Sequence, residues 1–175
     1  MFRPLGHQYA QRNKANLAKN IRQNYNDYFH KKQTGNGFYS GLADDAYDAI
    51  RTNKHDVSNI AKNTGFKEKN IQRIKDHLFY DKHLLDRYVE YGIPAEMKVF
   101  DSDIAIANAW MRLEQGIYNK YDIQLLKHET AEAWYMRNHD RSYTNAHNAA
   151  NKRYPAPDLE TMVDDFGNKF TNNRG

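Results

Sequence analysis

The apolar residues of this chain recur at helical spacing along almost its whole length. Ile104, Ala107, Trp110 and Leu113, for example, fall on one side of a helix at 100° per residue. No βαβ alternation and no internal repeat interrupts this period. The pattern predicts an all-α, compact multi-helix domain with at most one short strand pair, and residues 97–100 are the best strand candidate.

Glycine, proline and capping residues divide the chain into segments. Gly65 and Gly116 are placed to end helices, and Asp103 to begin one. Three parts follow: a helical region over 1–52, which is an entry segment or a packed arm, a main domain over 53–154, and a short helix with a frayed tail over 155–175. A shorter segment around 84–89 is broken by Gly92 and Pro94. The expected helices span about 7–32, 38–50, 56–63, 67–80, 104–115, 122–137, 144–153 and 159–166.

Composition excludes several classes of protein. The chain has no cysteine, which rules out disulfides, a thiol nucleophile and a cysteine-based zinc site. No apolar run approaches the roughly 18 residues of a membrane helix, and the first residues lack the apolar core of a signal peptide. Lysine and arginine number 26 against 22 aspartate and glutamate, a net charge of +4. This excess is compatible with an anionic partner and equally with an ordinary solvated surface.

Residues 56–79 have the spacing of a helix-turn-helix unit. Ala61 lets two helices approach, Gly65 takes the turn, and Ile71 and Ile74 lock the second helix. We expect the outward side of this second helix to offer donors to phosphates and base edges. The same spacing also arises in an αα-hairpin inside any helical domain. The candidate nucleic-acid contacts here are Lys69, Arg73 and Lys75.

The helix over 122–137 combines a histidine with two glutamates. Ile123, Leu126, Thr130, Ala133 and Trp134 are predicted to form its apolar stripe, whereas Glu129 and Glu132 lie on the shoulder and His128 just beyond. Carboxylates beside apolar neighbours need a cation, a metal or a proton. Helix packing could bring the other candidates to the same cleft, namely His83, His147, Lys82, Lys127 and Arg153.

Three interpretations of this helix compete. His128, Glu129 and Glu132 resemble the zincin motif with its second histidine replaced by glutamate, although no third zinc ligand is evident in the sequence. Alternatively, the side chains suit metal-independent cleavage of RNA, in which a glutamate or histidine takes the 2′-hydroxyl proton and another histidine protonates the leaving oxygen. Otherwise His128 and Glu132 form a solvated i, i+4 pair.

Several stretches between Asp56 and Tyr154 are similar to C-terminal toxin domains of bacterial polymorphic and contact-dependent growth inhibition proteins, modules that also follow phage head proteins. They are residues 60–66, 74–86, 109–113, 125–132 and 146–150. The resemblance implies a toxin that is part of a larger secreted or cell-surface protein, acts in the cytoplasm of a target cell and is neutralised by a cognate immunity protein. Such domains are most often nucleases.

The resemblance places the active site on Lys82, His83, His128, Glu129 and His147. The leading hypothesis is a metal-independent ribonuclease that acts on tRNA and needs no cofactor. Glu129 or His128 would be the general base, His147 or His83 the general acid, and Lys82, Lys127 or Arg153 would contact the phosphate. The alternatives are a non-enzymatic helix-turn-helix protein that binds nucleic acid, and a zinc-dependent hydrolase that uses His128, Glu129 and Glu132.

Overall fold

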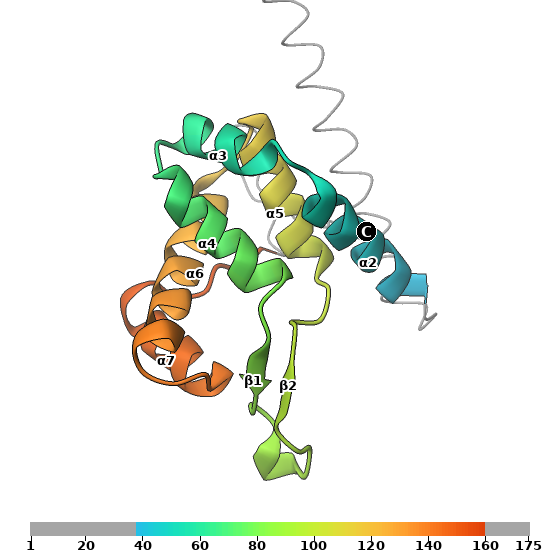
Figure 1. Cartoon of the computed structure of the whole chain (residues 1–175), viewed down its shortest axis with the longest axis vertical. Coiled ribbons are helices and arrows are strands. Elements are labelled where there is room, and N and C mark those ends of the chain that lie inside the picture. The colour runs from blue at the N-terminus through green and yellow to red at the C-terminus, as the bar shows by residue number, and fades with distance from the viewer. Residues whose placement is uncertain (1–37, 160–175) are drawn as a thin grey trace, which may run out of the picture.

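The computed structural model describes residues 38–159. These residues form six α-helices and one antiparallel pair of short strands, which confirms the all-α prediction (Figure 1). The predicted helices over 7–32 and 159–166 lie outside the described residues, apart from Leu159. The helices are α2 (Phe38–Thr52), α3 (Asp56–Thr64), α4 (Glu68–Phe79), α5 (Ile104–Gln115), α6 (Lys120–Asn138) and α7 (Tyr143–Arg153), and the strands are β1 (His83–Leu85) and β2 (Glu96–Lys98).

Local chemistry explains the helix boundaries. Gly65 and Gly116 end α3 and α5 with φ angles of 78° and 71°, in the left-handed region that glycine adopts without strain. The Asp103 carboxylate accepts hydrogen bonds from the first amides of α5. Asn119 and Asp122 form a reciprocal capping box at the start of α6. These boundaries agree with the predicted ones to within two residues.

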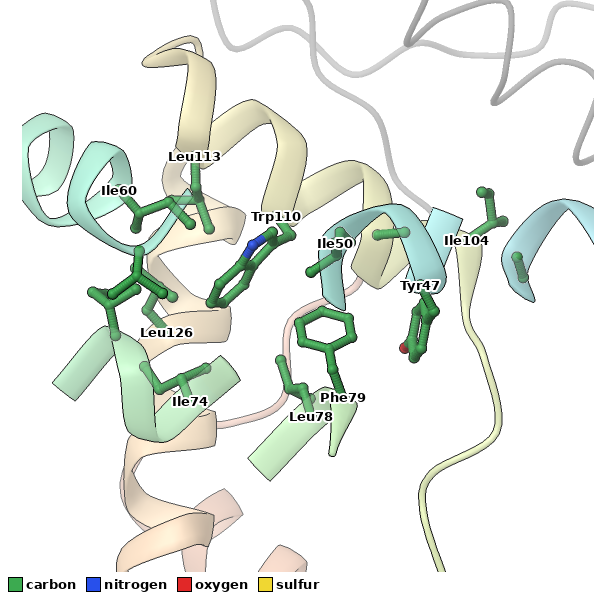
Figure 2. Packing of buried hydrophobic residues seen from close by; sticks show 14 residues of the cluster. Tyr47, Ile50, Ile60, Ile74, Leu78, Phe79, Ile104, Trp110, Leu113 and Leu126 are labelled. Atoms are coloured by element: carbon green, nitrogen blue, oxygen red, sulfur yellow. The ribbon is translucent and has the colours of Figure 1, made fainter. Parts of the chain in front are cut away.

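The core lies between α2, α3, α4 and α5, with Leu126 of α6 closing one side. Figure 2 shows Trp110 and Phe79 at its centre, with their rings packed edge to face and Tyr47 and Ile50 beside them. Tyr47 and Ile50 are buried, so α2 packs in the same core as the helices of the main domain. The sequence division at residue 52 therefore does not coincide with a break in packing.

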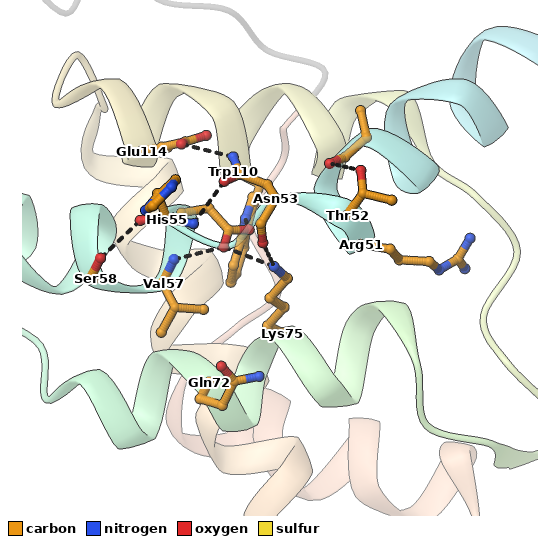
Figure 3. A network of polar contacts seen from close by, with 12 residues as sticks. Arg51, Thr52, Asn53, His55, Val57, Ser58, Gln72, Lys75, Trp110 and Glu114 are labelled. Atoms are coloured by element: carbon orange, nitrogen blue, oxygen red, sulfur yellow. Dashed lines mark hydrogen bonds and ion pairs between the residues drawn. The ribbon is translucent and has the colours of Figure 1, made fainter.

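A buried ion pair ties α3 to α4. The Lys75 ammonium lies 2.8 Å from an Asp56 carboxylate oxygen and 2.7 Å from the Asn53 carbonyl oxygen. The Trp110 indole N–H donates to the other carboxylate oxygen of Asp56, and the Val57 amide to the first (Figure 3). Lys75 is 4% exposed. The prediction that Lys75 faces outward to bind nucleic acid is therefore wrong.

The short sheet extends from one end of the helical body, and β1 lies beside α7. In Figure 1 the β1–β2 hairpin projects away from the helices, and β1 runs beside the start of α7. Asp86, just after β1, accepts hydrogen bonds from the Ser142 hydroxyl and the Thr144 amide. The strand predicted over residues 97–100 corresponds to β2, which spans Glu96–Lys98 and pairs with residues 83–85.

The buried face of helix α6 differs from the predicted apolar stripe. Leu125, His128, Glu129 and Glu132 are buried with Leu126, whereas Trp134 is 53% exposed. The placement of Trp134 on the apolar stripe is therefore wrong, and the two glutamates face the interior. Among residues 38–159, no helix has the length and apolar character needed to cross a membrane.

Candidate metal centre

Three helices bring five ionisable side chains to one place in the interior. His77 comes from the last turn of α4, His147 from the middle of α7, and the other three from consecutive turns of α6. We call this group the His–Glu cluster; it consists of His77, His128, Glu129, Glu132 and His147. All but His147 are buried, and the His147 side chain is 19% exposed.

The Glu132 carboxylate is the centre of the cluster. One of its oxygens, Oε1, lies 3.1 Å from His77 Nε2. The other, Oε2, lies 3.1 Å from His147 Nδ1 and 3.3 Å from His128 Nε2. Each oxygen therefore faces a different side of the cluster.

The orientation of His128 creates a demand for positive charge. Its Nδ1 is 2.7 Å from the Tyr154 carbonyl oxygen, and a carbonyl only accepts, so Nδ1 carries the proton. In the neutral ring, Nε2 then has a lone pair that points at Glu132 Oε2 and, at 3.2 Å, at His147 Nδ1. Two acceptors that face each other inside a protein repel. A proton on His147 Nδ1, a second proton on His128, or a metal ion between the ligand atoms relieves this repulsion.

The three atoms form a triangle of the size that a metal ion requires. His128 Nε2, His147 Nδ1 and Glu132 Oε2 are separated by 3.1, 3.2 and 3.3 Å. Zinc–ligand bonds of roughly 2.0–2.1 Å at tetrahedral angles place the ligand atoms about 3.3 Å apart. The bond from His128 to the Tyr154 carbonyl is also the outer-shell contact by which metal-binding histidines are commonly oriented. His147 is thus placed where a third ligand, absent from the sequence pattern, would be needed.

A second group of ligand atoms shares Glu132. His77 Nε2 lies 3.1 Å from Glu132 Oε1 and 3.5 Å from Glu129 Oε2, and the ligand atoms of all three residues lie within 4.8 Å of one another. All three side chains are buried. Among the described residues, His77 is the only ion-pairing contact of Glu129.

The two carboxyl groups have opposite electrostatic character. Burial, together with the negative charge of Glu132, raises the pKa of Glu129 well above its usual range. Burial also acts to raise the pKa of Glu132, but the three histidines around it outweigh burial and bring its pKa well below the usual value. The cluster therefore holds one firmly ionised carboxylate and one whose ionised form lacks a compensating cation.

His83 supports the cluster rather than joining it. Its Nε2 donates a hydrogen bond of 2.8 Å to the His77 carbonyl oxygen, and its ring lies against Phe100. Burial and the neighbouring His77 lower the pKa of His83. Because its Nε2 donor is committed to this carbonyl, His83 is placed to position His77.

Two cavities reach different members of the cluster. The first, of about 560 Å³, is lined by His128, Glu129, Glu132 and His147 and by many apolar residues. Its other polar lining comprises Arg87, Lys98 and Tyr143 and the acidic residues Glu96, Asp101, Asp103 and Asp158. Burial and the cluster's carboxylates raise the pKa of Tyr143 to about 12, so its hydroxyl is a hydrogen-bond donor at neutral pH. The second cavity, also of about 560 Å³, reaches His77 and His83 and is lined by the charged residues Arg73, Asp76, Asp81, Lys82, Arg137 and Arg141.

The predicted site residues separate into two groups. His128, Glu129, Glu132 and His147 lie together, and the exposed Lys82 lines the second cavity beside His83. Three further predicted contacts, Lys69, Lys127 and Arg153, are exposed and line neither of these two cavities.

The site residues chosen from the sequence did not include His77. It lies three residues after Ile74 on the buried side of α4, as a core residue would. A histidine on the apolar face of α4 was the sequence signal that could have indicated a site residue there.

Comparison of the chain with models of known protein families, with curated proteins and with solved structures finds no match.

Proposed function

We propose that this domain is a metal-dependent hydrolase whose ion is held by His128, Glu132 and His147. The observation that carries the proposal is the orientation of His128, whose lone pair is directed at two further ligand atoms at bonding-triangle distances. Two imidazole nitrogens and one carboxylate oxygen form a donor set that suits zinc, with further coordination positions left for water and substrate.

Zinc bound in this way supplies Lewis-acid chemistry and an activated water. The protein's own part is to hold the two histidines and Glu132 in place. Tyr154 holds His128 through its carbonyl, and His77 does the same for Glu132 from the opposite side. The first cavity gives a substrate access to His147, the most exposed member of the cluster.

For the substrate we propose a phosphodiester bond of nucleic acid, RNA before DNA. The resemblance to toxin nucleases supports this choice, and so does the charge around the second cavity. Four cations line it, and none of them forms an ion pair with another residue among those described; two aspartates also line it, which leaves a net charge of +2. The cations are Arg73, Lys82, Arg137 and Arg141. Backbone phosphates are attracted by such a surface regardless of sequence.

The proposal extends to the biology that the resemblance implies. The domain would act in the cytoplasm of a target bacterium after delivery as part of a larger protein, and a cognate immunity protein would bind and inhibit it. Co-purification with the product of a neighbouring open reading frame, and loss of toxicity when that product is co-expressed, test this part.

One observation favours metal-independent RNA cleavage as a second candidate. His147 is partly exposed, lines the first cavity and has Glu132 as a carboxylate partner 3.1 Å from its Nδ1. A histidine oriented by a carboxylate in this way can act as a general acid or base. His128 fits this chemistry less well because both of its ring nitrogens already face protein atoms.

The test combines metal analysis with nucleic-acid gels. The full chain, purified without a histidine tag, is analysed for bound metal, and total RNA and DNA from cells that express it are run on gels. We expect stoichiometric zinc, RNA cleavage that stops with a chelator and returns with Zn²⁺, and loss of both metal and cleavage in Glu132→Gln. His139→Asn, a change at an exposed histidine outside the cluster, serves as the matched control.

Each alternative outcome supports a different function. Cleavage that survives the chelator, in a chain without metal, supports the metal-independent ribonuclease. Nucleic-acid binding that depends on Lys69 and Arg73 but not on His128, without any cleavage, supports the helix-turn-helix binding protein. Metal without cleavage of either nucleic acid removes the proposed substrate and leaves the ion site.

A further inference from the structure

We propose that the His–Glu cluster holds two divalent cations, the second bound by His77, Glu129 and Glu132. This inference rests on the proposed function, because Glu132 would bridge the second ion to the first. It assigns roles to His77 and Glu129, two buried groups that a single ion leaves unexplained.

The Glu132 carboxylate has the orientation of a bridge. Its Oε2 faces the His128 and His147 nitrogens, whereas its Oε1 faces only His77 among the histidines of the cluster. A carboxylate that binds a single ion directs one or both of its oxygens toward that ion. Here the two oxygens point to two sets of ligand atoms, and bridged ions in such centres lie about 3.5–4 Å apart.

Glu129 supplies the second argument. Its side chain is 9% exposed, and its one ion-pairing contact among the described residues is the His77 Nε2 at 3.5 Å, which is a cation only when the ring is doubly protonated. An ionised carboxyl in such a position is costly unless it is paired or coordinates a metal. A proton on Glu129 is one remedy; an ion between Glu129, Glu132 and His77 is the other, and it compensates both carboxylates at once.

The arrangement around His77 favours the ion. The His83 Nε2 holds the His77 backbone through a 2.8 Å hydrogen bond, and the rings of His83 and Phe100 pack against the His77 ring. The backbone and the ring of His77 are therefore both held in place, as metal ligands are by the residues that support them. The second cavity reaches His77, so an ion can enter this group of ligand atoms through it.

Charge predicts that the second ion binds more weakly than the first. The cluster contributes two carboxylates, which one divalent cation neutralises; a second leaves an excess of two positive charges. Hydroxide or an anionic substrate such as a phosphate ester would compensate this excess. We therefore expect inorganic phosphate to tighten the binding of the second ion.

The experiment counts bound ions in the full chain, using Zn²⁺ alone as the probe. The chain is stripped with a chelator, titrated with Zn²⁺ in a calorimeter with and without inorganic phosphate, and analysed for metal after equilibrium dialysis. Because the chain has no cysteine, no thiolate competes for the metal. A parallel sample loaded with Mn²⁺ is examined by electron paramagnetic resonance, in which two carboxylate-bridged ions give an exchange-coupled signal.

We expect two equivalents of zinc in the wild-type chain and one in Glu129→Gln, a variant that keeps the shape of the side chain. His147→Asn should also bind one equivalent, and a chain that carries both substitutions should bind none tightly. His139→Asn, the matched surface control, should keep two. Circular dichroism establishes that each variant is folded, and the Mn²⁺ signal of Glu129→Gln should lose its exchange coupling.

The outcomes separate this inference from the proposed function. One equivalent in the wild-type chain, unchanged in Glu129→Gln, overturns the second ion and leaves the hydrolase proposal standing. No bound metal overturns both. Two equivalents that persist in Glu129→Gln, without exchange coupling, place the extra ion elsewhere and also overturn the inference.

Discussion

The buried pair of Asp56 and Lys75 allows a quantitative test of the fold. Replacing Asp56 with alanine leaves the Lys75 ammonium, 4% exposed, without its carboxylate partner, although the Asn53 carbonyl oxygen stays 2.7 Å away. The Trp110 indole N–H also loses its acceptor. Removing one partner of a buried ion pair costs about 3–5 kcal/mol. Since one hydrogen bond to Lys75 survives, we expect about 3–4 kcal/mol.

A second variant isolates the cause. In Asp56→Ala combined with Lys75→Met, no charge is left buried. The indole N–H and the Val57 amide still lack the Asp56 acceptor, and the Asn53 carbonyl oxygen loses its donor. Each buried unpaired group costs about 1–3 kcal/mol, less than an unpaired buried charge. The double variant should therefore be more stable than Asp56→Ala alone. Asp48→Ala is the matched control, because Asp48 pairs with Arg51 at a similar distance, 2.9 Å, but its side chain is 72% exposed. Exposed pairs contribute about 0–1 kcal/mol.

Urea denaturation, followed by tryptophan fluorescence in the presence of a chelator, measures these differences. With an m-value of about 2 kcal/mol per molar, the midpoint for Asp56→Ala should fall by about 2 M, and that for Asp48→Ala by less than about 0.5 M. The reasoning fails if the two aspartate variants lose similar stability, or if the double variant is no more stable than Asp56→Ala.

Three further predictions concern a turn, the cluster and the basic surface. Gly65→Ala should destabilise the fold by about 1–2 kcal/mol because Gly65 has a φ of 78°. Gly41→Ala, at an exposed position of helix α2, should be neutral or stabilising by up to about 1 kcal/mol. Thermal unfolding of the two variants measures the difference. The raised pKa of Glu129 means that folding favours its protonated form, so the metal-free chain should lose stability as the pH rises above about 4.3, the usual glutamate pKa. Glu129→Gln should remove this loss. Urea midpoints measured across pH that coincide for the two chains would contradict this prediction. Arg73→Ala with Arg137→Ala should weaken RNA binding and reduce the slope of log K against log salt by about 1–2, measured by fluorescence anisotropy, and an unchanged slope would exclude this surface.

The helices of this protein could be predicted from sequence because their signals are local. Apolar spacing, Gly65 and Gly116 as helix ends, and Asp103 as a cap act within one or two turns of the chain. The same local signals grouped His128, Glu129 and Glu132 on one region of α6, since a helix places residues three and four apart side by side.

The faces of the helices were harder to predict. Lys75 and Trp134 have the opposite exposure from the one that their types suggested: the lysine is buried because Asp56, from another helix, compensates its charge, and the tryptophan is exposed because α6 directs its glutamates inward. The short strands were predicted only in part, because strand pairing joins residues that are distant along the chain.

Sequence alone therefore determined the helical class, the helix boundaries and the candidate residues of α6, all properties that depend on neighbours within a few positions. Only the tertiary structure decided which histidines surround Glu132. His77 lies 55 residues before it and His147 15 residues after it, on two other helices. The packing of α4 and α7 against α6 brings these side chains together, and the resulting distances, not the residue types, distinguish a candidate metal centre from a set of separate histidines.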